Sequence, residues 1–237
     1  MNRKLRKPVK FFLLIMCILS FVYFFLPHNH DHQHGPFINK LPPTSDLATW
    51  QKINPEIFAL LEFTSDDVTT QIPIIYTANG DHYMLHDIYG HYDTMGAVFM
   101  EKQISPLSSS NNYIINGHSS KTKNWNFTFL KKYNDLDYFT KHPEFTFIDK
   151  QGTHQYQIIS FSEYDLDDQD TYLGWHNNYF ASYAEAKNMF DNTLAYTINR
   201  VDGFYYHQQQ MITLVTCNMQ KHNARYVLQA VEKTERK

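Results

Sequence analysis

The chain has 237 residues, enough for one substantial domain with an appendage, and its length does not require two separate cores. Apolar residues make up 43% and charged residues 19% of the composition, which excludes a largely disordered protein, and the aromatic fraction of 16% favours β structure. Five of the 21 Lys and Arg residues lie in the first ten positions, so the rest of the chain is acidic by about eight charges and no nucleic-acid partner is expected.

The N-terminal segment has the pattern of an export signal. Residues 1–8 form a basic tail that we expect in the cytoplasm, and residues 9–26 contain the uncharged stretch FFLLIMCILSFVYFFL, near the lower length limit for a membrane span. A cleaved signal peptide is the alternative, but the residues that follow show no small-x-small cleavage pattern. We therefore predict a single-pass signal-anchor in the cell membrane, with the following domain outside the cell.

Residues 27–45 are rich in Pro, His and Asn and lack apolar periodicity, which indicates a tether between the membrane and a domain over residues 46–237. His28, His30, His32 and His34 alternate along this tether, and alternating imidazoles can bind Zn²⁺ or Cu²⁺. No carboxylate or Cys framework fixes a coordination geometry, so the sequence predicts a polar spacer and no metal site.

The predicted elements of the domain begin with two helices and continue mainly as strands. Asp46 or Ser45 can cap a helix through Ile53, and Asn54 followed by Pro55 predicts a second helix over residues 54–63. Strands are predicted over 72–76, 96–101, 112–118, 144–150, 154–164, 211–217 and 224–232, with a hairpin turn over 150–153.

One further helix is predicted over residues 182–197, where Ser182 and Glu185 have capping-box spacing. It precedes the last two strands. Because the short strands do not alternate with helices, the pattern favours a mainly β fold with a closed, mainly antiparallel barrel.

Cys217 is the only cysteine outside the apolar N-terminal run, since Cys17 lies within it. Cys217 ends an apolar, β-branched strand, and Arg225 follows eight positions later, a spacing that suits a strand, a tight loop and an antiparallel neighbour. A cation near a thiol lowers the thiol pKa and favours a nucleophile. His118 lies where another predicted strand opens into a loop. Each residue also has a non-catalytic interpretation. Cys217 could be a small buried apolar side chain, Arg225 a solvated strand residue, and His118 a structural histidine.

Three segments, NYIINGHSS, ITLVTC and ARYVLQA, together resemble the His, Cys and Arg motifs of sortases, the membrane-anchored cysteine transpeptidases of Gram-positive bacteria. INPEIFALLEF, YMLHDIYG, GAVFME and the helix before the cysteine strand are similar to sortases of class B, over roughly residues 46–233. The resemblance implies an eight-stranded sortase-type β-barrel with N-terminal helices and a helix inserted before the cysteine strand.

The resemblance also implies catalytic roles for residues at the matching positions. Cys217 corresponds to the nucleophile, His118 to the proton-transfer residue, and Arg225 to the cation that holds the substrate carbonyl and its developing oxyanion. Thr216 matches the family's Thr and is expected to donate a hydrogen bond to the oxyanion. A preorganised cation stabilises such an oxyanion most strongly in a partly dry groove.

Val215, Asn218 and Leu85 are the other implied substrate-binding positions. Two of them depart from the class pattern, because Val215 stands where class B members often have Ser, and Asn218 stands where an acidic residue is frequent. These two departures leave the sorting motif open.

The implied activity is cleavage of a C-terminal sorting motif of an exported protein after Thr, with a thioester on Cys217 and transfer to an amine of the cell-wall precursor. No cofactor is expected. A class B-like sortase that polymerises pilins through a Lys acceptor is the close alternative. A membrane-tethered cysteine peptidase and a surface metal-binding protein built on the cluster of residues 28–34 are the rivals from other classes.

Overall fold

The computed structural model describes residues 46–65, 68–101, 111–123, 125–167 and 174–233. The strands are β1 (Ile57–Ser65), β2 (Val68–Thr77), β3 (Val98–Glu101), β4 (Asn112–Asn116), β5 (Glu144–Ile148), β6 (Thr153–Asp165), β7 (Thr197–Arg200), β8 (Met211–Cys217) and β9 (Ala224–Glu232). The helices are α2 (Leu47–Ile53), α3 (Gly80–Met84), α4 (Leu136–Lys141) and α5 (Tyr183–Thr193), with 3₁₀ turns η3 (Thr128–Asn134) and η5 (Leu194–Tyr196).

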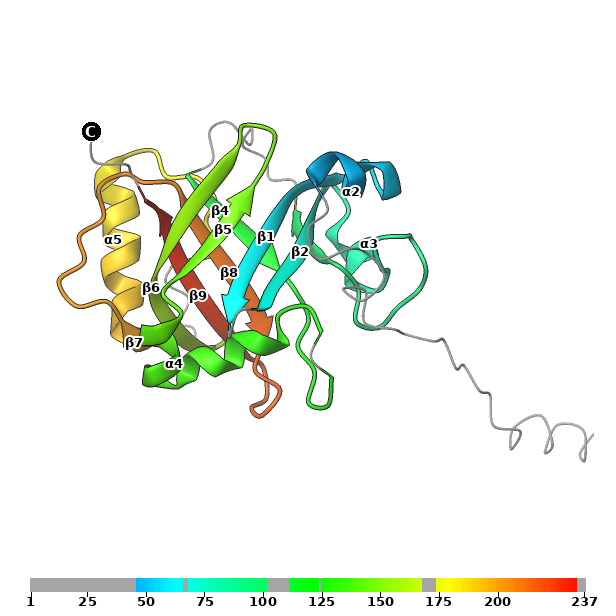
Figure 1. Ribbon diagram of the computed structural model, residues 1–237. Coiled ribbons are helices and arrows are strands. Elements are labelled where there is room, and N and C mark those ends of the chain that lie inside the picture. Colours follow the sequence, from blue (N-terminus) through cyan, green and yellow to red (C-terminus); the bar gives the residue numbers. More distant parts are fainter. Residues whose placement is uncertain (1–45, 66–67, 102–110, 124, 168–173, 234–237) are drawn as a thin grey trace, which may run out of the picture. The chain divides into compact units, whose positions relative to one another are not determined.

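Eight of these strands close into a barrel. The order along the sheet is β5-β1-β2-β3-β4-β8-β9-β6-β7, and the additional pairing of β5 with β6 closes the ring and leaves β7 at the edge of β6 (Figure 1). Only the β2–β3 and β4–β8 pairs are parallel among the described strands. The prediction of a mainly β, closed eight-stranded barrel is therefore confirmed.

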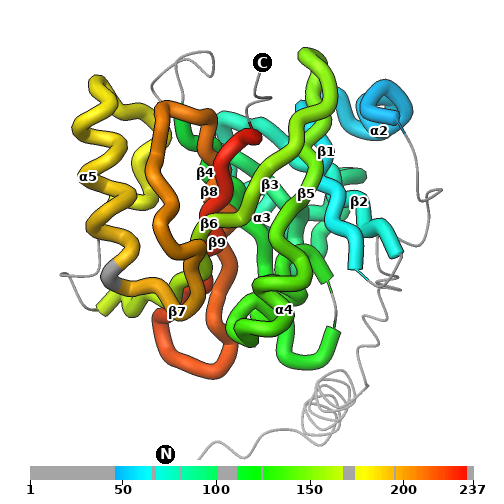
Figure 2. The backbone as a smooth tube through the Cα atoms, turned by 60° about the vertical axis from the view of Figure 1, so that its left-hand side comes forward, coloured from blue at the N-terminus to red at the C-terminus, as the bar shows by residue number. Residues whose placement is uncertain are grey.

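Strand alternation divides the buried residues into an interior core and outer clusters. On β8, Ile212 and Leu214 belong to the barrel interior, whereas Met211 and Val215 belong to a cluster on the outer face. Helix α5 supplies the other half of this outer cluster and lies against the sheet there (Figures 1 and 2). The same alternation places Cys217, two residues after Val215, on the outer face and beyond the part of the sheet that α5 covers.

The helix predicted over residues 54–63 is wrong, because this segment forms β1. The Asn54 side chain accepts from the backbone N–H of Glu56 at 2.9 Å, an i to i+2 turn, and does not cap a helix. Leu60 and Leu61 are both fully buried, Leu61 in the barrel interior and Leu60 in an outer cluster near α2. Burial on both faces removes the alternation that would have identified a strand.

The other predicted elements are confirmed, with small changes at their ends. Asp46 caps α2 by accepting from the backbone N–H of Thr49, and Ser182 caps α5 by accepting from that of Glu185. The carboxylate of Glu185 in turn accepts from the N–H of Ala181, the residue before the N-cap, at 2.9 Å, rather than from the N–H of Ser182 as in a standard capping box. The short edge strand β7 was not predicted, because its four residues carry no distinct pattern.

The predicted basic tail, signal-anchor and tether, including the histidines of residues 28–34, lie outside the residues that the structure describes. Within residues 46–65, 68–101, 111–123, 125–167 and 174–233, no helix has the length and apolar character needed to cross a bilayer. The same ranges hold no group of three or more His, Cys, Asp or Glu side chains suited to a metal ion.

Candidate active site

Cys217 and Arg225 lie opposite each other at one end of the barrel. Cys217 is the last residue of β8, Arg225 the second residue of β9, and the two are paired directly in the antiparallel ladder. Side chains of directly opposite residues project from the same face of a sheet with Cβ atoms about 4.5–5.5 Å apart. Both side chains are half-buried, so the thiol and the guanidinium share one partly dry surface.

His118 reaches the same surface from the other side of β8. Strands β4 and β8 run parallel with Asn116 opposite Val215, and the N–H of Gly117 donates to the Val215 carbonyl at 3.1 Å. Continuing this register brings His118 level with Cys217 on the outer face. The backbone register thus places His118 and Arg225 on the two chain segments that flank Cys217.

The orientation of the His118 ring is fixed by a backbone group. Its Nε2 lies 2.8 Å from the carbonyl oxygen of Met84, the last residue of α3. A carbonyl oxygen only accepts hydrogen bonds, so Nε2 carries the proton in this contact. The other ring nitrogen, Nδ1, is then the one that can take a proton from the thiol and return it.

Gly117 allows the strand carrying His118 to come close to its neighbours. A Cβ atom at this position would lie 2.7 Å from the Phe127 ring and 3.1 Å from Val98. The backbone N–H of Phe127 also donates to the His118 carbonyl at 3.1 Å. The segment 116–118, where β4 ends, is therefore packed between the buried Phe127 ring and strand β8.

Thr216 is placed differently from the expectation. Its side chain is 2% exposed, and its hydroxyl donates to the Gly117 carbonyl at 2.7 Å, on the interior side of the sheet. In this structure the Thr216 hydroxyl joins β8 to the end of β4 and does not share the face of Cys217. Its contribution is to hold the His118 segment beside the thiol.

The three other expected substrate-binding residues differ in accessibility. Val215 is 6% exposed and packs in the outer cluster under α5, and Asn218 is 3% exposed. Leu85 is 44% exposed and directly follows Met84, whose carbonyl holds His118. Leu85 is therefore available to a ligand in this structure, while Val215 and Asn218 contribute to packing and to loop geometry.

Asn218 holds the loop that joins the two strands of the site. Its backbone N–H donates to the Ala224 carbonyl at 2.9 Å, and its side-chain Nδ2 donates to Glu163 on β6 at 2.7 Å. The second oxygen of Glu163 accepts from the ammonium of Lys221, in the same loop. Glu163 was missed by sequence reasoning, because nothing in the sequence shows that it reaches a residue 55 positions away.

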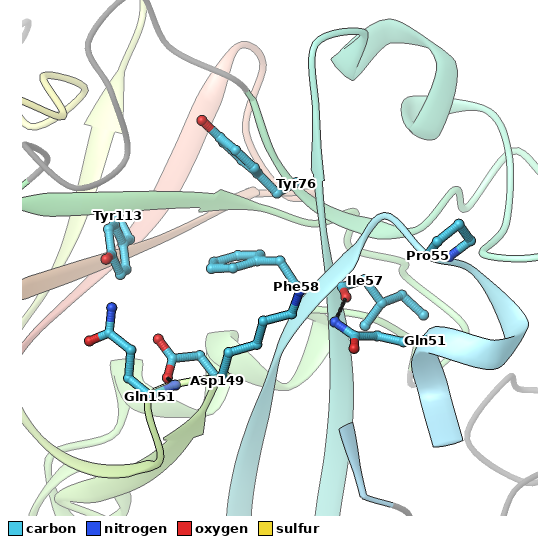
Figure 3. A pocket seen from close by; sticks show the side chains of 9 residues that line it. Gln51, Pro55, Ile57, Phe58, Tyr76, Tyr113, Asp149 and Gln151 are labelled. Atoms are coloured by element: carbon cyan, nitrogen blue, oxygen red, sulfur yellow. Dashed lines mark hydrogen bonds between the residues drawn. The ribbon is translucent and has the colours of Figure 1, made fainter. Parts of the chain in front are cut away.

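Among the residues that the structure describes, two of the cavities lie at opposite ends of the barrel. One, of about 410 Å³, is lined by Lys131 on η3 and by residues that closely follow the candidate catalytic ones: Ser119, Ser120, Lys121, Asn218, Met219, Gln220 and Tyr226. The other, of about 360 Å³, lies where β4 begins and contains Phe58, Tyr76, Tyr113 and Asp149 (Figure 3). None of the predicted site residues lines this second cavity.

The grouping of thiol, imidazole and guanidinium has a defined chemical capacity. A thiol attacks a carbonyl when a neighbouring base can accept its proton, and the tetrahedral intermediate places negative charge on oxygen. A guanidinium on the same face can stabilise that charge through planar, paired donors. The site is therefore suited to acyl transfer through a thioester.

Comparison with known proteins agrees with this fold. The sequence model of the Sortase domain family matches residues 66–233, so the chain belongs to the sortase family. Its similarity is to class B: the chain is 26% identical to sortase B of Listeria monocytogenes over 177 residues, which is 74% of this chain and 68% of that protein.

Two solved structures show the same fold. Clostridium perfringens sortase B has a TM-score of 0.70 and 17% identity, with 80% of this chain and 100% of that chain covered. A Streptococcus pyogenes class B sortase involved in pilus biogenesis has a TM-score of 0.64 and 18% identity, with 78% of this chain and 97% of that chain covered. The class B resemblance drawn from the sequence is confirmed.

Proposed function

We propose that this sortase is a cysteine transpeptidase that cuts a C-terminal sorting motif of an exported protein after Thr and transfers the new acyl end to an amine. The observation that carries the proposal is the position of half-buried Cys217 at the end of β8, paired with Arg225 on β9 and level, by the β4–β8 register, with His118 two residues beyond β4. Family membership supports the same chemistry.

Each of the three residues has one role in the proposed reaction. The Cys217 sulfur attacks the carbonyl carbon of Thr, His118 takes the thiol proton at Nδ1 and passes it to the leaving amine, and the C–N bond breaks. Arg225 donates to the carbonyl oxygen while it carries negative charge. The incoming amine then forms a new C–N bond, the C–S bond breaks, and the amine proton returns through His118 to the sulfur.

The acceptor that we propose is an amine of the cell-wall precursor, which would anchor the exported protein to the wall. A lysine of a pilin subunit is the second candidate, favoured by the structural similarity to the class B sortase involved in pilus biogenesis. The predicted signal-anchor over residues 9–26 would hold the enzyme at the membrane with its N-terminus in the cytoplasm, next to both kinds of acceptor.

Intact-mass spectrometry of the full chain in detergent tests the proposal. The protein is incubated with Leu-Pro-x-Thr and Asn-Pro-x-Thr peptides, and we expect an acyl adduct that an added amine discharges. The chain has two cysteines, so Cys17→Ala is the matched control for Cys217→Ala. An adduct that persists in Cys217→Ala would refute the assignment, and discharge by water alone would indicate a peptidase.

A further inference from the structure

The cavity of about 410 Å³ beside the candidate active site differs from the rest of the molecule in its charge. Two lysines, Lys121 after β4 and Lys131 on η3, line it, and no Asp or Glu does. The chain beyond its first ten residues is acidic by about eight charges, so a cavity with this balance is unusual for this protein. The loops that form it protrude from the same end of the barrel (Figure 1).

Both ammonium groups are available for a ligand. Among the described residues, neither Lys121 nor Lys131 has an ion-pair partner, and both side chains are exposed. The neighbouring lysines are placed differently, since the Nζ atom of Lys123 lies 4.0 Å from the centre of the Trp125 ring and that of Lys132 lies 5.4 Å from the centre of the Tyr138 ring. Lys121 and Lys131 therefore differ from Lys123 and Lys132, whose ammonium groups lie over aromatic rings.

The remaining lining adds hydrogen-bond donors and no competing charge. Burial, together with the charge of Glu163, raises the pKa of the Tyr226 phenol, which keeps its O–H as a donor. The carboxylate of Glu163 is held by Asn218 and Lys221 and does not line the cavity. The cavity thus offers two cations and neutral polar groups to an anionic ligand.

The position of the cavity relates it to the second step of the proposed reaction, the transfer of the acyl group from Cys217 to the acceptor amine. Val215 precedes Cys217 on β8, and Asn218 follows Cys217 as the first residue of the β8–β9 loop. Val215 is packed under α5, so the open space next to Cys217 along the chain is the cavity on the Asn218 side, and exposed Leu85 lies beside the residue whose carbonyl holds His118. An acceptor amine that approaches Cys217 from the Asn218 side passes this cavity.

We propose that this cavity binds a carboxylate carried by the acceptor amine, through Lys121 and Lys131, an inference that rests on the proposed transpeptidase function. The two cations also make the protonated amine less stable near the thioester. They thereby raise the fraction of neutral amine that can attack. The acceptor class is therefore an amino acid or peptide amine with a nearby carboxylate, rather than a simple alkylamine.

The test compares two acceptors that differ only in this charge, glycylglycine and glycylglycinamide. With full-length enzyme and a peptide that forms the acyl adduct, we expect the KM for glycylglycine to be lower by about fivefold, as two exposed ion pairs would give. The preference should vanish in the double variant Lys121→Ala/Lys131→Ala and shrink at high salt. It should persist in the matched double variant Lys123→Ala/Lys132→Ala.

Three other outcomes would overturn the inference in distinguishable ways. Equal KM values for the two acceptors in the wild type would remove the carboxylate site and leave the transpeptidase standing. A second pair of substrate peptides carries either Gln or Glu directly after the scissile Thr. If acylation by the Glu peptide depends on Lys121 and Lys131, the cavity binds the leaving segment and not the acceptor. Absence of any adduct on wild-type Cys217 would reject the proposed function itself.

Discussion

Cys217 and Arg225 are register partners across the β8–β9 hairpin, so one short loop sets the distance between thiol and guanidinium. The loop is fixed at both ends: Asn218 donates its N–H to Ala224, and its side chain donates to Glu163 on the neighbouring strand β6. A hairpin held in this way keeps the two groups in position before substrate binds, which is the condition for electrostatic stabilisation of a transition state.

Arg225→Lys tests whether the planar guanidinium is needed. Lysine keeps the charge but loses the paired donors, so we expect kcat for acyl-enzyme formation to fall by about tenfold or more, with little change in thermal stability. Arg200→Lys is the control, because Arg200 lies on β7 and its side chain is half exposed beside Asp202. Near-normal turnover by Arg225→Lys would show that a point charge is sufficient.

Gly96 offers a test of the contact that orients His118. Its φ is +54°, and an added Cβ would lie 2.7 Å from the Met84 carbonyl oxygen and against that of Tyr83. Gly96→Ala should therefore displace the carbonyl that accepts from His118, lowering kcat as well as stability, the latter by about 1–3 kcal/mol.

Gly90→Ala is the matched control for this substitution. Gly90 has φ +80°, in the same connection between α3 and β3, and a Cβ there meets nothing within 4 Å. Both variants carry the backbone strain of a non-glycine residue at positive φ, about 1 kcal/mol or more. Urea denaturation and single-turnover acylation measure the two effects, and equal kcat values for both variants would argue against the Met84 contact.

The sequence was sufficient for the parts of this protein that local patterns determine. The caps at Asp46 and Ser182 are local, and so is the strand-loop-strand spacing that pairs Cys217 with Arg225. The segment 54–63 was misassigned, because burial on both faces of β1 removes the period of two, and the Asn-Pro start resembles a helix cap.

Contacts between residues that are far apart in the chain could not be predicted from a single sequence. His118 meets the carbonyl of Met84, 34 positions away, and a backbone carbonyl carries no residue signature. Glu163 meets Asn218 across the β6–β9 pair, and the sequence predicts neither partner from the other. Thr216 was expected to face the oxyanion, but its hydroxyl donates to Gly117, because strand alternation turns it away from the face of Cys217.

Asn218→Asp would introduce the acidic residue that is frequent after the cysteine in this class, and we expect it to destabilise this chain. The new carboxylate would stand 2.7 Å from the Glu163 carboxylate at a position that is 3% exposed. Replacing a buried hydrogen bond by a like-charge contact should cost about 1–3 kcal/mol at neutral pH. The free energy of unfolding measures this directly.

Two comparisons separate the Asn218 effect from a general effect of added charge. In a Glu163→Gln background, the cost of Asn218→Asp should largely disappear, as a double-mutant cycle would show. Asn223→Asp makes the same change at the other end of the loop, where Asn223 donates to Asp167 on the exposed surface at 2.7 Å. Its cost should be smaller, and equal costs at both positions would contradict the role given to Glu163.

His154 predicts how stability depends on pH. Its Nδ1 lies 2.7 Å from Glu232 on β9, and its Nε2 lies 3.4 Å from Asp149 at the β5–β6 turn. Burial acts to lower the pKa of His154, but the hydrogen bond to Glu232 and the charges of Glu232 and Asp149 outweigh it, so the pKa is raised. The protonated ring thus ties the β5–β6 hairpin to the end of β9.

A raised folded-state pKa means that this stabilisation is complete below the unfolded value of about 6.5 and is lost as pH rises through the folded value. His154→Gln should therefore reduce the free energy of unfolding more at about pH 6 than at about pH 9. His207→Gln, at an exposed position, is the control for the loss of an imidazole. Urea denaturation at the two pH values decides the matter, because a cost for His154→Gln that is the same at both would mean that His154 acts through packing and not through its charge.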